Sequence, residues 1–264
     1  MKKIISLLLF VSSIQIHAED VIFMVHPIYA QQRSTEVFQP LVDYLEKNTG
    51  HNISLVVPKS FLFFWNKLRA KKGYDFVLLE PHLMDYGLQK LNLIPLVKSN
   101  LATQFSLLVS DKYAEEDPSE ALIGRIIATL PAPCMGNVLL GFIFPNPIKQ
   151  PRISTTAPSW RDGIESIFAG EADAAIVPTW LAERYPNLTA VIDSSPVSGF
   201  AIASQQTTDP AVQNSIKEAL LLLGVDKNEK ELEVLIELKT ERFESANASD
   251  FAGLSQLLTH VFGY

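Results

Sequence analysis

The chain has 264 residues, 47% of them hydrophobic, and its 22 basic and 29 acidic residues give a formal net charge of −7. This acidic balance argues against a nucleic-acid surface and against an acidic membrane surface. The single cysteine, Cys134, excludes an internal disulfide bond, so stability must come from one large apolar core or two smaller ones.

The first eighteen residues have the pattern of an export signal. Lys2 and Lys3 precede an apolar run over 4–14, and the small residue Ala18 offers a cleavage point. The run is shorter than the ~20 apolar residues that a membrane-spanning helix needs, and no later segment qualifies. We therefore expect residues 1–18 to be a signal peptide. The exported chain then begins at Glu19 with 20 basic and 29 acidic residues, a net charge of −9.

The next segment is predicted to begin with an amphipathic helix. Its apolar face repeats at helical spacing and consists of Val37, Phe38, Leu41 and Leu45. Ser34 or Thr35 can cap the start of this helix, and Gly50 suits the left-handed residue beyond its end. Pro40 is tolerable only if it lies in the first turn, because proline has no N–H to donate inside a helix.

The following elements repeat a simple order. A strand is predicted at 53–57, a helix at 61–72 that ends at Gly73, and a strand at 76–79 that is apolar throughout and so buried on both faces. The order helix, glycine, aspartate, apolar strand, proline occurs at 65–81 and again at 160–178. This echo favours two similar lobes, although any α/β protein repeats such units.

Five short matches carry a family resemblance. The pattern PLxxYLexxTG followed by YDfxxxxP is met at Pro40-Leu41, Tyr44-Leu45, Thr49-Gly50, Tyr74-Asp75 and Pro81. It resembles that of the periplasmic solute-binding proteins of phosphate, phosphite and phosphonate type, which deliver a ligand to ABC importers. The resemblance implies a periplasmic location and an α/β fold like that of type 2 periplasmic binding proteins. Such a fold has two lobes, each a mixed sheet flanked by helices, joined by two crossing hinge strands.

Two segments are suited to be the hinge strands. Residues 103–109 and 198–204 are apolar, strand-like and unbroken by proline. We therefore expect a discontinuous first lobe, made of residues 19–107 and 198–264, and a second lobe at 108–197. Gly199 is the candidate residue for absorbing a hinge motion, or else it is an ordinary strand entry.

Three helices are predicted after the return to the first lobe. Asp209 can cap the first of them, with Pro210 in its first turn. A charged helix is expected from Asn228 onward. The last helix is expected over 250–262, with Asp250 as its cap.

Candidate ligand residues lie in the loops after apolar strands, because open α/β sheets bind ligands there. In the family an aromatic residue in the first such loop contacts the ligand, and Tyr29 is the match, although it can instead pack on the following helix. Glu80 and His82 follow the strand that ends at Leu79. Glu80 suits a ligand with a cationic group beside its anion, or it caps the helix that starts near His82.

The first helix of the second lobe departs from the family pattern. In phosphonate binders this position holds Ser and Thr residues that cradle an oxyanion, but here Pro131, Pro133 and Cys134 replace them. Three amides can still point at an anion, those of Met135, Gly136 and Asn137. The lost hydroxyl groups make a more apolar carboxylate, or a ligand held by aromatic surface, an alternative to phosphate and phosphonate.

A further pair of candidate ligand residues is Thr179 and Trp180, at the carboxyl end of the buried strand that ends at Val177. Packing between the lobes would explain this tryptophan as well as ligand contact does. Ser159 is most simply the N-cap of the helix that begins at Trp160, before the buried strand.

The expected function is capture of a small polar or anionic molecule, phosphonate-like, phosphate-like or a carboxylate, for a membrane ABC permease. We expect a monomer without a cofactor. No enzyme is expected, because the sequence contains no G-x-S-x-G, S-x-x-K, H-E-x-x-H or Walker motif. Two alternatives stay open: a free-standing sensor subunit that presents its ligand to a membrane kinase, and a metal-binding protein that uses His26, Glu80 and His82.

Overall fold

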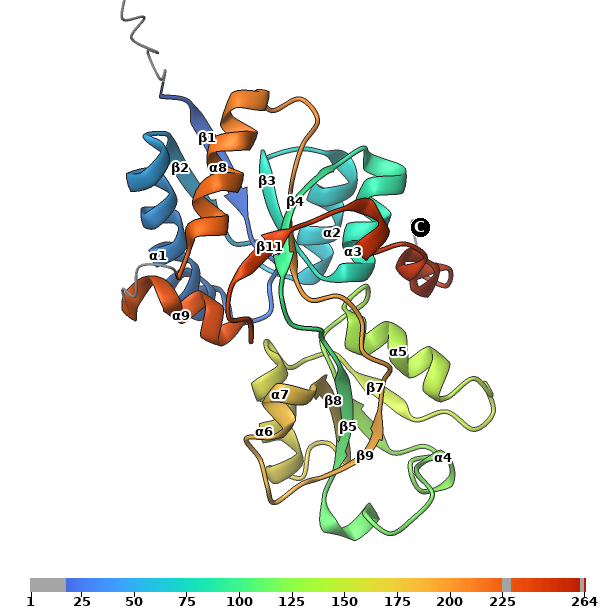
Figure 1. Ribbon diagram of the computed structural model, residues 1–264. Helices are drawn as coiled ribbons and strands as arrows, with labels where there is room; N and C mark the ends of the chain where they lie inside the picture. The colour runs from blue at the N-terminus through green and yellow to red at the C-terminus, as the bar shows by residue number, and fades with distance from the viewer. Residues whose placement is uncertain (1–17, 225–228, 262–263) are drawn as a thin grey trace, which may run out of the picture.

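The computed structural model describes residues 18–224, 229–261 and 264, which form two α/β lobes joined by two crossing segments (Figure 1). The predicted signal peptide falls almost wholly outside the described residues. Within the described part of the chain, no helix is both long and apolar enough to cross a membrane.

The first lobe is built on a six-stranded sheet with the order β11-β4-β10-β3-β1-β2. β1 (Asp20–Met24) runs parallel to β2 (Asn52–Val56) and to β3 (Phe76–Leu79). The other three strands are joined antiparallel and are β10 (Ala201–Ser204), β4 (Ile94–Ser99) and β11 (Phe243–Ser245). Figure 1 shows three helices on one side of this sheet, α1 (Gln31–Thr49), α8 (Pro210–Leu222) and α9 (Glu229–Glu237). The other side carries α2 (Phe61–Ala70) and α3 (Pro81–Tyr86).

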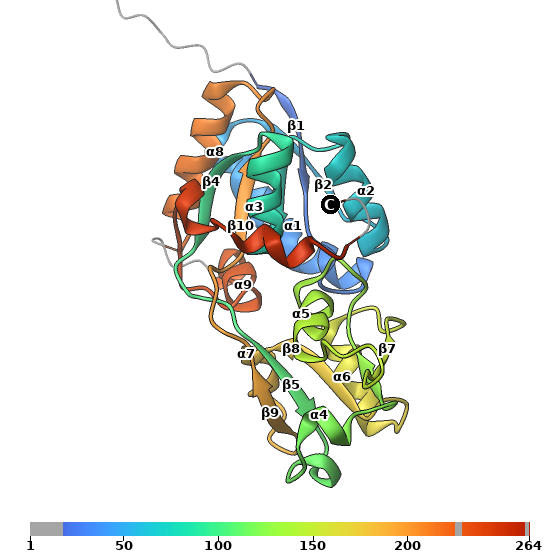
Figure 2. The ribbon, with the colours of Figure 1, turned by 90° about the vertical axis from the view of Figure 1, so that its right-hand side faces the viewer.

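The second lobe is built on a five-stranded sheet with the order β7-β6-β8-β5-β9. β5 (Phe105–Val109) is antiparallel to β8 (Ala174–Pro178) and β9 (Thr189–Asp193), whereas β6 (Ile126–Ala128) is parallel to β8 and β7 (Arg152–Ser154). Its helices are α4 (Pro118–Ala121), α5 (Met135–Ile143), α6 (Trp160–Phe168) and α7 (Thr179–Ala182). Figure 2 shows α5 at the end of this lobe that faces the first lobe. The predicted class, two lobes with mixed sheets flanked by helices, is confirmed.

The two lobes share a local design that explains the sequence echo. Asp75 Oδ2 accepts a hydrogen bond from the Ile22 N–H (2.7 Å), and Asp173 Oδ2 accepts one from the Ile126 N–H (2.9 Å). In both lobes the aspartate thus lies just before a buried strand and fixes the neighbouring parallel strand. The glycine that precedes each aspartate has a positive φ, as the sharp turn after the helix requires.

The first helix differs from its prediction at its start. α1 begins at Gln31 with Ala30 at the N-cap position, so neither Ser34 nor Thr35 caps it. Pro40 therefore lies in the middle of the helix. Its missing N–H deprives the Glu36 carbonyl of a partner, but Glu36 is exposed and water can serve that oxygen. The predicted end is confirmed, because Gly50 is left-handed with a φ of 74°.

The C-terminal helices are partly as predicted. Asp209 caps α8 by accepting a hydrogen bond from the Ala211 N–H (2.7 Å). The charged helix is described from Glu229 onward, and its expected start at Asn228 lies outside the described residues. The predicted helix over 250–262 is wrong. Two short 3₁₀ turns, Ala248–Asp250 and Leu254–Leu258, replace it, since Gly253 has a φ of 86° between them.

The crossing segments approach each other closely. Thr103 and Val197 form an antiparallel bridge, with N···O distances of 2.8 and 2.9 Å. Beside it, a Cβ at Gly199 would lie 2.4 Å from the Leu101 carbonyl oxygen. The need for glycine at 199 therefore comes from contact between the two crossing segments.

We expect Gly199→Ala to lower the free energy of unfolding by about 1–3 kcal/mol, because the new methyl group must displace backbone. Urea denaturation measures this. Gly141→Ala in α5 is the matched control, since no described atom lies within 4 Å of its added Cβ and alanine favours a helix. Equal stability of the two variants would contradict the close approach at Gly199.

Candidate functional site

A buried cluster of polar side chains joins the two lobes. Glu80 follows β3, and its Oε2 accepts a hydrogen bond from the backbone N–H of Met135 (3.1 Å), the first residue of α5. The same oxygen lies 3.0 Å from His26 Nε2, in the loop after β1. His82 Nε2 lies 2.7 Å from the Pro133 carbonyl oxygen. Glu80 is 1% exposed, and both histidines are fully buried.

The charge states of this cluster follow from its surroundings. Burial alone would raise the pKa of the Glu80 carboxyl, but His26, His82 and the Met135 N–H together hold that pKa below its ordinary value. Burial lowers the pKa of His82, against the attraction of the Glu80 carboxylate. At neutral pH Glu80 is therefore ionised, whereas His82 is neutral and donates its Nε2 proton to the Pro133 carbonyl.

Glu80 does not cap the helix that follows it, which corrects one of its two expected roles. α3 begins at Pro81, and among the described residues no side chain caps it. The carboxylate points across to α5 instead. The N-terminus of that helix has backbone N–H groups without helical partners and a positive partial charge, so a buried carboxylate is stabilised there.

In this cluster the three residues of the metal-binding alternative are not arranged as metal ligands. His26, Glu80 and His82 do come together, but Glu80 Oε2 and His82 Nε2 already face Met135 and Pro133. In the part of the chain that the structure describes, no group of three or more His, Cys, Asp or Glu residues is arranged to hold a metal ion.

A second region between the lobes is a cavity of about 320 Å³, which we call the arginine cavity. On the side of the first lobe the cavity is lined by Tyr29, in the loop before α1, and by Arg33, in the first turn of α1. Arg161 at the start of α6 and Trp180 in α7, with Arg184 just beyond α7, line it on the side of the second lobe. Two aromatic residues singled out from the sequence therefore meet in one cavity with walls from both lobes.

The guanidinium groups of this cavity differ in their partners. Arg33 Nη2 lies 2.9 Å from Glu237 Oε1, and the Tyr29 hydroxyl donates to Glu237 Oε2 (2.7 Å). Burial, and then the Glu237 carboxylate, raise the pKa of Tyr29, which therefore stays a neutral phenol. Arg184 lies over the Trp180 ring, 5.1 Å from its centre, and has no ion-pair partner among the described residues. Arg184 is thus the cation that remains available to an anion.

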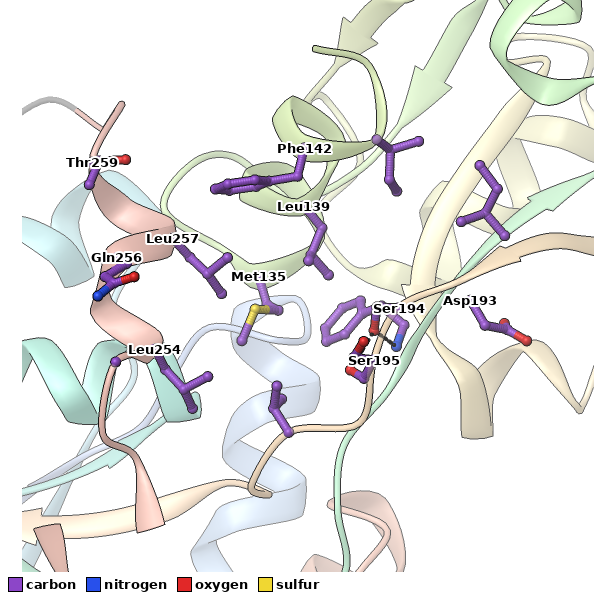
Figure 3. Close-up of a pocket in the computed structure, with 15 residues that line it drawn as sticks. Met135, Leu139, Phe142, Asp193, Ser194, Ser195, Leu254, Gln256, Leu257 and Thr259 are labelled. Carbon is purple, nitrogen blue, oxygen red and sulfur yellow. Dashed lines mark hydrogen bonds between the residues drawn. The ribbon is translucent and has the colours of Figure 1, made fainter. Parts of the chain in front are cut away.

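A third region is a cavity of about 700 Å³ beside α5, which we call the apolar cavity (Figure 3). Met135, Leu139 and Phe142 of α5 face Leu254 and Leu257 of the first lobe across it. Among the described residues that line it, the only charged one is Asp193. Figure 3 shows the Asp193 side chain turned away from the centre, and its Oδ1 accepts a hydrogen bond from the Ser106 hydroxyl (2.6 Å). This cavity offers no positive charge to an anion.

The remaining predicted site residues are dispersed. Asn137 lines a further cavity, of about 740 Å³, between α5 and α2. Gly136 packs closely, because an added Cβ would lie 3.1 Å from Thr129 Oγ1. The Thr179 hydroxyl is 2.8 Å from Ser106 Oγ, inside the second lobe. The eight predicted residues therefore do not converge on one cavity.

Sequence reasoning missed Arg184 and Glu237, two of the five charged residues among the described residues that line the arginine cavity. Arg184 stands four positions after Trp180, a spacing that brings side chains together on a helical turn, so this signal was present. Glu237 lies 208 positions after Tyr29 and reaches it only through the packing of α9 on α1. No local pattern could have found that contact.

This architecture is that of a two-lobed binding protein. It has two α/β lobes, a pair of crossing segments between them, and cavities with walls from both lobes. Residues 23–251 match the family described as ABC transporter, phosphonate, periplasmic substrate-binding protein. The chain belongs to this family, as its sequence resemblance predicted. It is therefore a periplasmic-type substrate-binding protein that captures a solute for an ABC importer.

Solved structures with the same fold have low sequence identity to this chain. PhnD1 from Prochlorococcus marinus, in complex with methylphosphonate, has a TM-score of 0.76 at 13% identity, over 90% of this chain and 97% of that one. A binding protein component of an ABC phosphonate transporter from Pseudomonas aeruginosa has a TM-score of 0.75 at 13% identity, over 91% and 86%. A Xanthomonas citri protein bound to ATP has a TM-score of 0.67 at 15% identity, over 90% and 95%. No curated protein sequence matches the chain.

Proposed function

We propose that the protein binds a small organic anion, a phosphonate or a carboxylate, in the arginine cavity and offers the closed form to a membrane permease. The observation that carries this proposal is Arg184, a guanidinium group without an ion pair among the described residues, stacked on Trp180 at the wall of a cavity between the lobes. Guanidinium groups suit phosphonate and carboxylate because they donate paired hydrogen bonds.

The cavity's other groups support the same ligand class. Tyr29 offers a ring face. Arg33 and Arg161 also line the cavity, but Arg33 is paired with Glu233 and Glu237, so Arg184 remains the cation available to the ligand. A ligand held from both sides would draw the lobes together, because only contacts to both lobes shift the balance of open and closed forms. The methylphosphonate complex and the phosphonate transporter component among the similar structures agree with an anion of this kind.

The proposal includes the remaining organisation of the chain. The first lobe combines the two ends of the chain and the second lobe its middle. Because β5 (Phe105–Val109) belongs to the second sheet, the expected boundary at 107/108 moves to before Phe105. The leader 1–18 is removed on export to the periplasm. The protein acts as a monomer and carries out no catalysis. Its ligand, once bound, is passed on unchanged.

A binding screen tests the proposal. Native mass spectrometry of freshly purified protein is followed by a thermal-shift panel of methylphosphonate, phosphate, small carboxylates and, as controls, amines. A bound anion raises the melting temperature by mass action. Small-angle X-ray scattering then checks that the same anion makes the protein more compact. A response to amines alone would overturn the proposal.

Tyr29→Ala and Trp180→Ala are expected to weaken anion binding about tenfold or more without unfolding the protein, because each removes an aromatic wall of the cavity. Titration calorimetry with the anion found in the screen measures the change. Phe168→Ala, which removes an aromatic ring that is 52% exposed on α6, is the matched control and should leave affinity unchanged. Unchanged affinity in both cavity variants would refute the assignment of these residues.

A further inference from the structure

We infer that Glu80 is a built-in anion: its carboxylate fills an anion site at the N-terminus of α5, excludes free anions from it and joins the two lobes without a ligand there. The inference deepens the proposed function and rests on it, because it concerns which part of the cleft an anionic ligand can use. Glu80 is thus a residue that determines specificity.

The surroundings of Glu80 are those of an anion site. Its Oε2 receives the Met135 N–H from the second lobe (3.1 Å) and lies 3.0 Å from His26 Nε2 of the first. α5 is a nine-residue helix, so its N-terminus adds a positive dipole end. A free phosphonate or carboxylate at this helix would need the same donors.

Polar atoms around the carboxylate are left unused. Glu80 Oε1, both ring nitrogens of His26 and His82 Nδ1 are buried, and within the described part of the chain none of them has a hydrogen-bond partner, although His26 Nε2 lies 3.0 Å from Glu80 Oε2. Buried polar atoms of this kind are uncommon in folded proteins, since each loses its contact with water. Glu80 Oε1 is an acceptor, and so is the Nδ1 of a neutral His82 whose Nε2 proton goes to the Pro133 carbonyl, so neither atom offers a donor to a second anion.

A second anion is excluded while Glu80 is present. Glu80 is ionised at neutral pH and only 1% exposed, so a free anion beside it would meet a like charge in a poorly screened setting.

The same contacts hold the lobes together. Glu80 to Met135 and His82 to Pro133 both run from the β3–α3 region of the first lobe to the segment that opens α5 in the second. In a two-lobed binder a ligand that contacts both lobes favours the closed form. Here a side chain of the protein makes such contacts, so the ligand's own anionic group has to bind elsewhere, and the arginine cavity offers the available cation.

Chemical rescue of Glu80→Ala tests the inference. The variant should melt about 10 °C below the wild type and have a larger radius of gyration in small-angle scattering. Sodium formate, whose carboxylate can take the vacated place, should restore both values in a saturable way, relative to sodium chloride at equal ionic strength. The wild type should show no such response to formate.

Two controls keep the test decisive. Glu80→Gln fills the same volume without the charge. It should therefore separate the lobes and resist rescue by formate. If Glu80→Ala fails to fold, the compactness of Glu80→Gln is measured in its place. Asp250→Ala removes a carboxylate that pairs with Lys98 at the surface (2.8 Å) and should show only the general salt effect. Wild-type compactness in both Glu80 variants, or wild-type binding of formate or methylphosphonate that Glu80→Ala abolishes, would overturn the inference. Neither result depends on binding in the arginine cavity, which the Tyr29 and Trp180 variants report separately.

Discussion

Replacing Arg184 with methionine is expected to weaken anion binding about 10- to 100-fold. Hydrogen bonds to charged groups contribute about 1.5–3 kcal/mol, and each 1.4 kcal/mol corresponds to a factor of ten in affinity. Arg184 has no ion pair among the described residues, so no carboxylate of the protein competes with the ligand for it. Titration calorimetry with the anion identified by the binding screen measures the loss.

A second guanidinium–tryptophan pair provides the control. Arg69 lies over Trp65, 5.4 Å from the ring centre, in the first lobe and outside the arginine cavity. Arg69→Met removes one positive charge from the protein, as Arg184→Met does, and should leave affinity unchanged. Equal losses in the two variants would mean that only the net charge of the protein matters, and the arginine cavity would not be the binding site.

The fold was predictable because its signals are local. Periodicity placed α1 and α2, and four consecutive apolar residues identified β3 as a strand buried on both faces. The glycine and aspartate before β3 and β8 recur because each lobe fixes a parallel strand by the same side-chain hydrogen bond. The prediction of a C-terminal helix was wrong because Gly253 interrupts an apolar pattern that would otherwise suit a helix.

The candidate site was only partly predictable, because charge pairing between distant segments decides it. Tyr29 and Trp180 could be chosen from their positions after buried strands. The partner of Glu80 could not, since Met135 lies 55 positions later and comes near only when the lobes pack. A carboxylate before a helix suggests a cap for that helix, but the structure directs it to a helix of the other lobe.

Acid is expected to weaken the contact between the lobes. A carboxyl whose folded pKa is lowered stabilises the fold above its unfolded pKa, near 4.5, and this contribution is lost as pH falls through the folded pKa. His82 also has a lowered pKa, so below about 6.5 the unfolded chain gains a proton that the folded protein does not. Both effects reduce stability as pH falls, with a slope near 1.4 kcal/mol per pH unit for each proton.

Urea denaturation at pH 8, 6.5, 5.5 and 4.5 measures the loss of stability, and small-angle scattering at the same pH values measures the separation of the lobes. The titratable groups that face Glu80 are His26 from the loop after β1, His82 from α3 and the Cys134 thiol from the segment before α5. Burial, and then the Glu80 carboxylate, raise the pKa of that thiol, so it does not titrate in this range. His82→Gln removes the imidazole while keeping a donor for the Pro133 carbonyl, and it should flatten the slope between pH 6.5 and 5.5. A wild-type slope in this variant, or stability that is constant from pH 8 to 4.5, would exclude the buried cluster as the acid-sensitive contact.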